Sequence, residues 1–170
     1  FHDTIFGPIH SRRLGTSLGV NLMPNDGKIC SFDCLYCEAG YNAQGAGKAG
    51  ISTREEVRAA LEDKLKAMHA AGDRLDVITF SGNGEPTVHP VFGGVVDDVI
   101  ALRNKYYPSV KISVLSNSTM IDCPAVAEAL LKVDNNILKL DSAVDATMRL
   151  IDRPANKEFT VEHVVGHLKK

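Results

Sequence analysis

The sequence alternates between short apolar runs and longer segments with helical periodicity, and this alternation constrains the fold more than any other feature. The apolar runs predict strands at residues 17–22, 76–80, 111–115 and 137–140. The periodic segments predict helices at residues 53–71, 91–106 and 124–132, and a last one from about Thr160. Strands separated by helices favour a parallel sheet, so we expect an α/β fold whose active residues gather at the carboxyl ends of the strands.

Length and composition favour one domain. The chain has 170 residues, and a hydrophobic content of 44% is enough for a core.

Its 19 basic and 21 acidic residues give a formal net charge of −2, so no general positive field argues for nucleic acid or an anionic membrane. Apolar stretches such as residues 95–102 are much shorter than the roughly 20 residues of a membrane span, and no secretory signal is visible. We therefore expect a cytoplasmic protein.

Three cysteines are bunched in a C-x3-C-x2-C run formed by Cys30, Cys34 and Cys37, on the loop after the first predicted strand. Bunched cysteines suit metal ligation better than a disulfide framework. A four-iron cluster normally takes four cysteine ligands, so three would leave one iron open to bind another molecule. Spacing alone also allows a zinc site completed by a histidine, or free thiols in a glycine-rich loop. Cys123 stands apart, and we expect a structural role for it.

Polar residues follow the later strands. Residues 81–86 read SGNGEP, where glycines allow backbone groups to approach a ligand and Glu85 can accept hydrogen bonds from an ammonium group. The same residue types also favour an ordinary turn. After the third strand, Asn117 is either a ligand contact or a cap. Asp141 and Ser142 follow the fourth strand and are candidates by position, whereas we expect Lys139 to alternate away from the site.

These motifs together resemble those of the radical S-adenosylmethionine (SAM) superfamily. The cysteine run, with an aromatic residue directly before its third cysteine, is similar to the superfamily signature, and SGNGEP resembles its Gly-Gly-Glu-Pro element with Asn83 inserted between the glycines. The resemblance implies that Cys30, Cys34 and Cys37 hold a [4Fe-4S] cluster whose open iron binds SAM. It also implies a set of SAM-binding residues, with Tyr36 at the adenine, Gly82, Gly84 and Glu85 at the methionine end, and Asn117 at the ribose.

The resemblance further implies a fold and a reaction. The fold is a partial (β/α) barrel of the radical SAM type, with about four βα units present of an expected six, so we expect residues 1–170 to be a core domain truncated at its C-terminal end. The reaction is that of an oxidoreductase, in which an electron donor such as flavodoxin or ferredoxin reduces the cluster. SAM is then cleaved to methionine and a 5′-deoxyadenosyl radical, which abstracts hydrogen from an unidentified substrate. We expect no acid–base catalytic side chain.

Residues 7–21 resemble a narrower group, the iron–sulfur oxidoreductases related to wyosine-type tRNA-modification enzymes. Arg12 and Arg13 in this stretch could grip a carboxylate or phosphate of SAM or substrate, or form ordinary surface ion pairs. The net charge does not support tRNA as a partner. Two other functions stay open, namely the activation of a glycyl-radical enzyme, and a zinc-binding interaction module without catalysis. The zinc module would need a fourth ligand from His10, His89 or Cys123.

Overall fold

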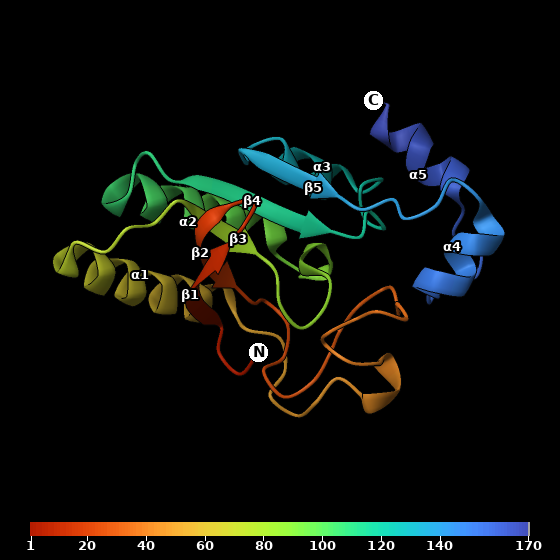
Figure 1. Ribbon diagram of the computed structural model, residues 1–170, viewed down its shortest axis with the longest axis horizontal. Coiled ribbons are helices and arrows are strands. Elements are labelled where there is room, and N and C mark those ends of the chain that lie inside the picture. Colours follow the sequence, from red (N-terminus) through yellow and green to blue (C-terminus); the bar gives the residue numbers. More distant parts are fainter. Residues whose placement is uncertain (170) are drawn as a thin grey trace.

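The computed structural model describes residues 1–169, which contain one five-stranded sheet. Its strands lie side by side in sequence order: β1 (Ile5–Ser11), β2 (Gly15–Val20), β3 (Val77–Phe80), β4 (Lys111–Ser116) and β5 (Asn135–Leu138). The strands from β2 to β5 are parallel to their neighbours, whereas β1 is antiparallel to β2. This mostly parallel sheet confirms the predicted α/β class (Figure 1).

The strand β1 was not predicted, since the first predicted strand lies at residues 17–22. Its apolar alternation is weak because Gly7 and Pro8 interrupt it, and its pairing with β2 shifts register between Phe6 and Ile9. Proline cannot donate to a ladder and is tolerated at the edge of a sheet, which is where β1 lies. A hairpin therefore precedes the first parallel strand.

Five α-helices follow in the described residues: α1 (Arg54–Ala71), α2 (Phe92–Tyr106), α3 (Pro124–Leu130), α4 (Asp145–Asp152) and α5 (Val161–Leu168). The start of α1 is a capping box, in which the Thr53 hydroxyl accepts from the Glu56 amide and the Glu56 carboxylate accepts from the Thr53 amide. Gly72 ends α1 in the left-handed conformation, with φ of 71°. The helix α4 was not predicted, whereas the predicted bounds of the other four helices lie within two residues of those observed.

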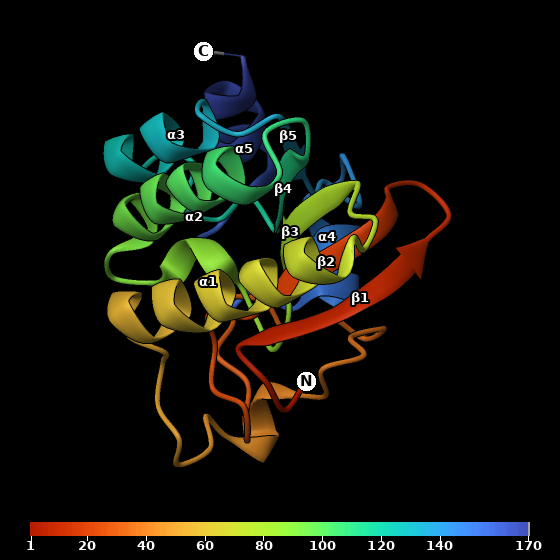
Figure 2. The same cartoon turned by 90° about the vertical axis from the view of Figure 1, so that its left-hand side faces the viewer.

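The helices α1, α2 and α3 form one layer against one face of the sheet (Figure 2). The main core lies between the two layers, and all four residues of β3 are buried, as expected for a central parallel strand. The largest side chains of this core with almost no exposure include Leu18, Leu61, Leu65, Ile78, Phe80 and Ile112. Four parallel strands with helices on one side form the partial barrel that we expected.

The helices α4 and α5 lie apart from this layer, beyond the carboxyl ends of β4 and β5 (Figure 1). A second, smaller apolar cluster connects them to the cysteine loop, residues 30–37. In that cluster the rings of Phe32 and Phe159 meet edge to face, with centroids 5.4 Å apart. The cysteine loop is therefore packed between the end of the sheet and this pair of helices.

None of the helices in residues 1–169 combines the length and the apolar character that a membrane crossing requires.

Candidate functional site

The three bunched cysteines lie on the loop that leaves β2, at the carboxyl end of the sheet. Cys30, Cys34 and Cys37 all line one cavity of about 260 Å³, which we call the thiol cavity. The loop after β3 contributes Glu85 to its wall, and the ends of β4 and β5 contribute further polar residues. All cysteines of the chain are free thiols. The carboxyl ends of the parallel strands thus bring together the groups that the sequence places far apart.

A second and larger cavity adjoins the first. This outer cavity has a volume of about 720 Å³ and is lined by residues of the cysteine loop and by residues 81–84 of the loop after β3. The two cavities share four wall residues, which are Tyr36, Cys37, Gly84 and Leu115. A molecule that fills the outer cavity would therefore contact Cys37 in the shared wall.

The loop after β3 is joined to the chain just before Cys30. The Ile29 amide donates to the Asn83 carbonyl and the Glu85 amide donates to the Ile29 carbonyl, each at 3.1 Å. Gly84 has φ of 144°, and a Cβ atom at this position would lie 1.8 Å from the Ile29 carbonyl oxygen. Glycine is therefore required here by the close approach of two backbone segments. The role of Gly84 in SAM binding stays a prediction.

Gly82 is required for a similar reason. Its φ is 143°, and a Cβ atom would lie 2.3 Å from the Asn21 Oδ1 atom. Asn21 is itself buried at the end of β2, and its Oδ1 atom accepts a 3.0 Å hydrogen bond from the Asn83 amide. The inserted Asn83 thus takes part in holding the loop, and the predicted contact of Gly82 with SAM is not tested by this geometry.

Glu85 connects the loop after β3 to the end of β4. Its side chain is buried, with Oε1 accepting from the Thr87 amide at 3.1 Å and from the Thr87 hydroxyl at 2.6 Å, while Oε2 accepts from the Asn117 amide at 2.6 Å. Loss of solvent raises the pKa of Glu85. Because two carboxylate oxygens offer about four acceptor positions, Glu85 retains capacity for a further donor in the cavity.

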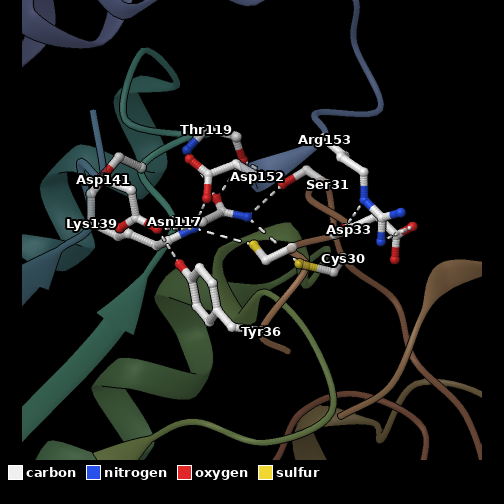
Figure 3. A network of polar contacts seen from close by, with 12 residues as sticks. Cys30, Ser31, Asp33, Tyr36, Asn117, Thr119, Lys139, Asp141, Asp152 and Arg153 are labelled. Carbon is white, nitrogen blue, oxygen red and sulfur yellow. Dashed lines mark hydrogen bonds and ion pairs between the residues drawn. The ribbon is translucent and has the colours of Figure 1, made fainter. Parts of the chain in front are cut away.

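Asn117 bridges the end of β4 and the cysteine loop (Figure 3). Its Nδ2 atom donates to the Ser31 hydroxyl at 2.9 Å and lies 3.6 Å from the Cys30 sulfur. Its Oδ1 atom accepts from the Thr119 amide at 3.1 Å and from the Thr119 hydroxyl at 2.8 Å. The side chain therefore holds the loop at Cys30, and its predicted contact with the SAM ribose stays a prediction.

Tyr36, which lines the thiol cavity, contacts Asp141. The Tyr36 hydroxyl donates to the Asp141 carboxylate, although the tyrosine is 57% exposed. Loss of solvent around the phenol and this hydrogen bond raise the pKa of Tyr36. Asp141 was a candidate by position, and the structure brings it to the site. Ser142 instead exchanges hydrogen bonds with the Val144 backbone in an exposed turn.

Lys139 was expected to point away from the site, and that expectation is wrong. Its Nζ atom lies 3.2 Å from the Cys34 sulfur, 2.6 Å from Asp152 Oδ1 and 3.3 Å from Asp141 Oδ2. The strand β5 ends at Leu138, so strand alternation no longer decides the direction of the next side chain. Desolvation lowers the pKa of Lys139, but hydrogen bonds, led by the one to Asp152, outweigh it and raise the pKa overall, so the side chain is a cation.

Asp152 and Arg153 are site residues that the sequence analysis missed. They belong to an anchor segment, residues 151–155, that pairs with the cysteine loop through backbone hydrogen bonds. The Asp33 amide donates to the Asp152 carbonyl at 2.9 Å, and Arg153 Nε donates to the Asp33 carbonyl at 2.7 Å. The amphipathic pattern of residues 145–152 could have revealed α4, but not the partner of its buried Asp152.

Arg12 and Arg13 do not reach the site. They lie exposed in the turn between β1 and β2, at the opposite end of β2 from the cysteine loop. A strand of six residues is about 20 Å long at roughly 3.3 Å per residue. Of the alternatives for Arg12 and Arg13, a grip on SAM bound beside the cysteines is therefore excluded by this separation.

The candidates for the fourth ligand of a zinc site lie elsewhere. His10 belongs to β1, the His89 ring contacts the Ser52 carbonyl at 2.8 Å, and Cys123 is the N-cap residue of α3. None of these three residues lines the thiol cavity. Across residues 1–169, no three His, Cys, Asp or Glu side chains converge closely enough to hold a single metal ion. The three cysteine thiols line a cavity and are not close enough together to hold a single metal ion.

The donor set fits an iron–sulfur cluster. Three free thiols face one cavity, which matches a cofactor of several atoms with three cysteine ligands. Loss of solvent raises the pKa of Cys30 and of Cys34, although Lys139 opposes this effect at Cys34, so a positive centre in the cavity would favour the thiolate forms. A metal cluster supplies such a centre. Cys30, Cys34 and Cys37 are thus the residues that could hold it.

Sequence comparisons identify relatives of nearly the whole chain. A UPF0026 protein of Helicobacter pylori (strain 26695) is 33% identical over 159 residues, which are 91% of this chain and 48% of that protein. A protein of Brachyspira hyodysenteriae named GTPase Obg is 30% identical over 164 residues, which are 96% of this chain and 22% of that protein. A UPF0026 protein of Methanocaldococcus jannaschii is 30% identical, with coverages of 94% and 47%. The chain therefore spans about half the length of these relatives, or less.

A comparison of structures agrees on the fold. A solved structure described as native anSMEcpe with bound AdoMet, another abbreviation of SAM, matches 89% of this chain and 40% of that chain, with a TM-score of 0.61 and 23% identity. The narrower likeness to wyosine-type enzymes is not confirmed by these relatives. The sequence profile of the Radical SAM superfamily matches residues 25–170. Because that match includes the cysteine run and most of the sheet, the chain belongs to the Radical SAM superfamily.

Proposed function

We propose that this chain is the core of an enzyme that cleaves SAM reductively at a [4Fe-4S] cluster held by Cys30, Cys34 and Cys37. The proposal depends above all on one observation, that the three thiols line a cavity which shares a wall with a larger one beside the loop after β3. When bound, such a cluster supplies an electron that breaks a carbon–sulfur bond of SAM, giving methionine and a 5′-deoxyadenosyl radical that abstracts hydrogen from a substrate.

The residues around the cavities would bind and orient SAM. Glu85 retains acceptor capacity for the ammonium group of the methionine end, and Gly82 and Gly84 leave the backbone of their loop uncovered. Tyr36 offers an exposed ring at the shared wall of the two cavities, where an adenine could stack. The Asn117 Oδ1 atom already accepts twice from Thr119, so a ribose hydroxyl would accept from Nδ2, whose second N–H group has only the 3.6 Å contact with the Cys30 sulfur.

The rest of the protein would complete the site. The strand β5 is the last strand of the sheet in residues 1–169, and Ile137 on it is 42% exposed. We infer that the domain continues beyond residue 170, as the greater length of the relatives suggests, and that the continuation covers this edge and selects the substrate. The reducing electron would come from a donor protein such as a flavodoxin or a ferredoxin.

An electron paramagnetic resonance (EPR) experiment tests the proposal. The protein is purified without oxygen, reconstituted with iron and sulfide, and reduced with dithionite in the presence and absence of SAM. We expect a [4Fe-4S] signal that changes when SAM is added, disappears in Cys34→Ala, and persists in Cys123→Ala, a matched loss of a thiol outside the cavity. One equivalent of bound zinc without such a signal, or a signal that ignores SAM, would overturn it.

A further inference from the structure

Lys139 occupies an unusual position among the groups of the site. Its Nζ atom lies 3.2 Å from the Cys34 sulfur, and the same ammonium group lies 4.8 Å from the centroid of the Phe32 ring and 5.2 Å from that of the Tyr36 ring. Both rings belong to the cysteine loop. The cation is therefore in contact with the cysteine loop on both sides of Cys34 in the sequence.

Asp152 fixes the ammonium group at this place. Its side chain is 2% exposed, and its Oδ1 atom accepts a 2.6 Å hydrogen bond from Lys139 Nζ. The backbone of the same residue is joined to the cysteine loop, because the Asp33 amide donates to the Asp152 carbonyl at 2.9 Å. A lone buried charge would be costly, so the carboxylate and the ammonium stabilise each other beside the sulfur.

The other thiols have different surroundings. The Cys30 sulfur faces the neutral amide of Asn117 at 3.6 Å, a longer contact without a formal charge. Among the described residues, Cys34 is the only cysteine whose sulfur accepts a hydrogen bond from a cation. The arrangement is thus asymmetric, with one ligand of the proposed cluster singled out by a positive charge.

We propose that Lys139 is a positioning residue that raises the reduction potential of the cluster through its hydrogen bond to the Cys34 sulfur, and that Asp152 holds it there. This inference rests on the proposed function. Reduction adds one electron, and hence one negative charge, to the cluster and its ligands. A cationic donor at a ligand sulfur stabilises this reduced state more than the oxidised state, which makes the electron easier to accept.

The test measures the midpoint potential of the reconstituted full chain by redox titration with dithionite, followed by EPR. We expect Lys139→Met to lower the equilibrium constant for reduction about tenfold, which corresponds to about 59 mV for a one-electron couple. Lys139→Arg, which keeps a cationic donor, should restore most of the potential. Lys132→Met is the matched control. Lys132 follows α3 and forms an exposed ion pair with Asp97 of α2, so this variant should leave the potential unchanged.

A second variant keeps the test decisive if Lys139→Met is unstable. The double variant Lys139→Met with Asp152→Asn removes both charges, so that the buried Asp152 is not left without its cation. It should still lower the potential, but by less than Lys139→Met, because loss of the Asp152 negative charge acts in the opposite direction and only Lys139 contacts the sulfur directly. A potential equal to that of the wild type in a folded, iron-loaded variant overturns the inference and leaves the proposed function intact. Failure of the wild type to form a SAM-responsive cluster overturns the proposed function itself, and this inference with it.

Discussion

Arg153 Nε donates a 2.7 Å hydrogen bond to the carbonyl oxygen of Asp33, and this contact ties the end of α4 to the middle of the cysteine loop. Its Nη2 atom also approaches Asp33 Oδ2 to 3.1 Å, an ion pair without the alignment of a hydrogen bond. Arg153 has φ of 45°, which is uncommon for a residue other than glycine. The contacts with Asp33 compensate for this unfavourable backbone conformation.

Arg153→Ala should loosen the cysteine loop. The change removes a hydrogen bond from a charged donor, which typically stabilises by about 1.5–3 kcal/mol. We expect lower iron content after reconstitution and faster cleavage by trypsin after Lys28, a residue only 5% exposed beside the loop. Arg74→Ala is the control, since its ion pair with Asp76 is exposed and remote from the loop. Trypsin resistance and iron content equal to those of the wild type would contradict this role of Arg153.

Asp98 joins α1 to α2, and its loss should destabilise the fold. Arg54 donates to both of its carboxylate oxygens at 2.7 and 2.9 Å, and the Asp98 side chain is 9% exposed. We expect Asp98→Ala to lower the free energy of unfolding by about 1–3 kcal/mol, measured by urea denaturation. The neighbouring Asp97 forms an exposed ion pair with Lys132, so Asp97→Ala should cost about 0–1 kcal/mol. Equal losses of unfolding free energy in Asp98→Ala and Asp97→Ala would contradict the greater contribution of the buried ion pair.

The contribution of Asp98 should depend on pH. Hydrogen bonds from Arg54 hold the pKa of Asp98 below its usual value. A carboxyl group with a lowered pKa in the folded state adds stability that is fully present above its unfolded pKa of about 3.9 and is lost as the pH falls through the folded pKa. The difference in unfolding free energy between wild type and Asp98→Ala should therefore be constant from pH 7 to about pH 5 and shrink below about pH 4. A difference that stays constant at lower pH would argue against the ion pair.

Gly84→Ala should damage both stability and the site. The new Cβ atom would collide with the Ile29 carbonyl next to Cys30, so we expect a loss of about 1–3 kcal/mol or more in unfolding free energy, and less bound iron. Gly166→Ala is the matched control in α5, where the described residues place no heavy atom within 4 Å of the new methyl group apart from the neighbouring residues and backbone of the helix itself. Alanine in a helix should stabilise there by up to about 1 kcal/mol. Thermal unfolding and iron analysis of both variants test these two predictions.

The ring and the hydroxyl of Tyr36 should contribute differently to SAM binding. Tyr36→Phe loses the hydrogen bond to Asp141 but keeps the ring, so SAM affinity of the iron-loaded protein should change less than about twofold. Tyr36→Ala removes the stacking surface, which for nucleic acid bases is worth about 1–3 kcal/mol, and affinity should fall about tenfold or more. Isothermal titration calorimetry measures both. Wild-type affinity in Tyr36→Ala would refute the adenine contact.

Local signals in the sequence were sufficient for most of the fold. Thr53 and Gly72 mark the ends of α1 because capping and left-handed termination depend on a few neighbouring residues. The strand β1 lacks such a signal, since Gly7 and Pro8 break its pattern and its partner strand decides its existence. The bunching of the three cysteines was visible in the chain itself, and the cavity that they line follows from their place after β2.

The remaining parts of the site depend on contacts between distant segments. Lys139 follows the end of β5, where the Asp152 carboxylate and the Cys34 sulfur decide its direction. Glycine at position 84 was interpreted as an approach to a ligand, but the structure also requires it against Ile29. The partners of Lys139 and of Gly84 cannot be recognised from sequence spacing, because they belong to distant segments that the fold brings close.

The link between Asp33 and Arg153 has a consequence for the order in which the protein is made, because the two residues are 120 positions apart in the chain. Translation at roughly 5–20 residues per second makes Arg153 about 6 to 24 s after Asp33. Throughout this interval the nascent chain carries its thiols without the anchor that later holds them, and thiols in this state are open to oxidation. Insertion of the metal centre is therefore expected late in biogenesis, after the anchor segment has left the ribosome and docked.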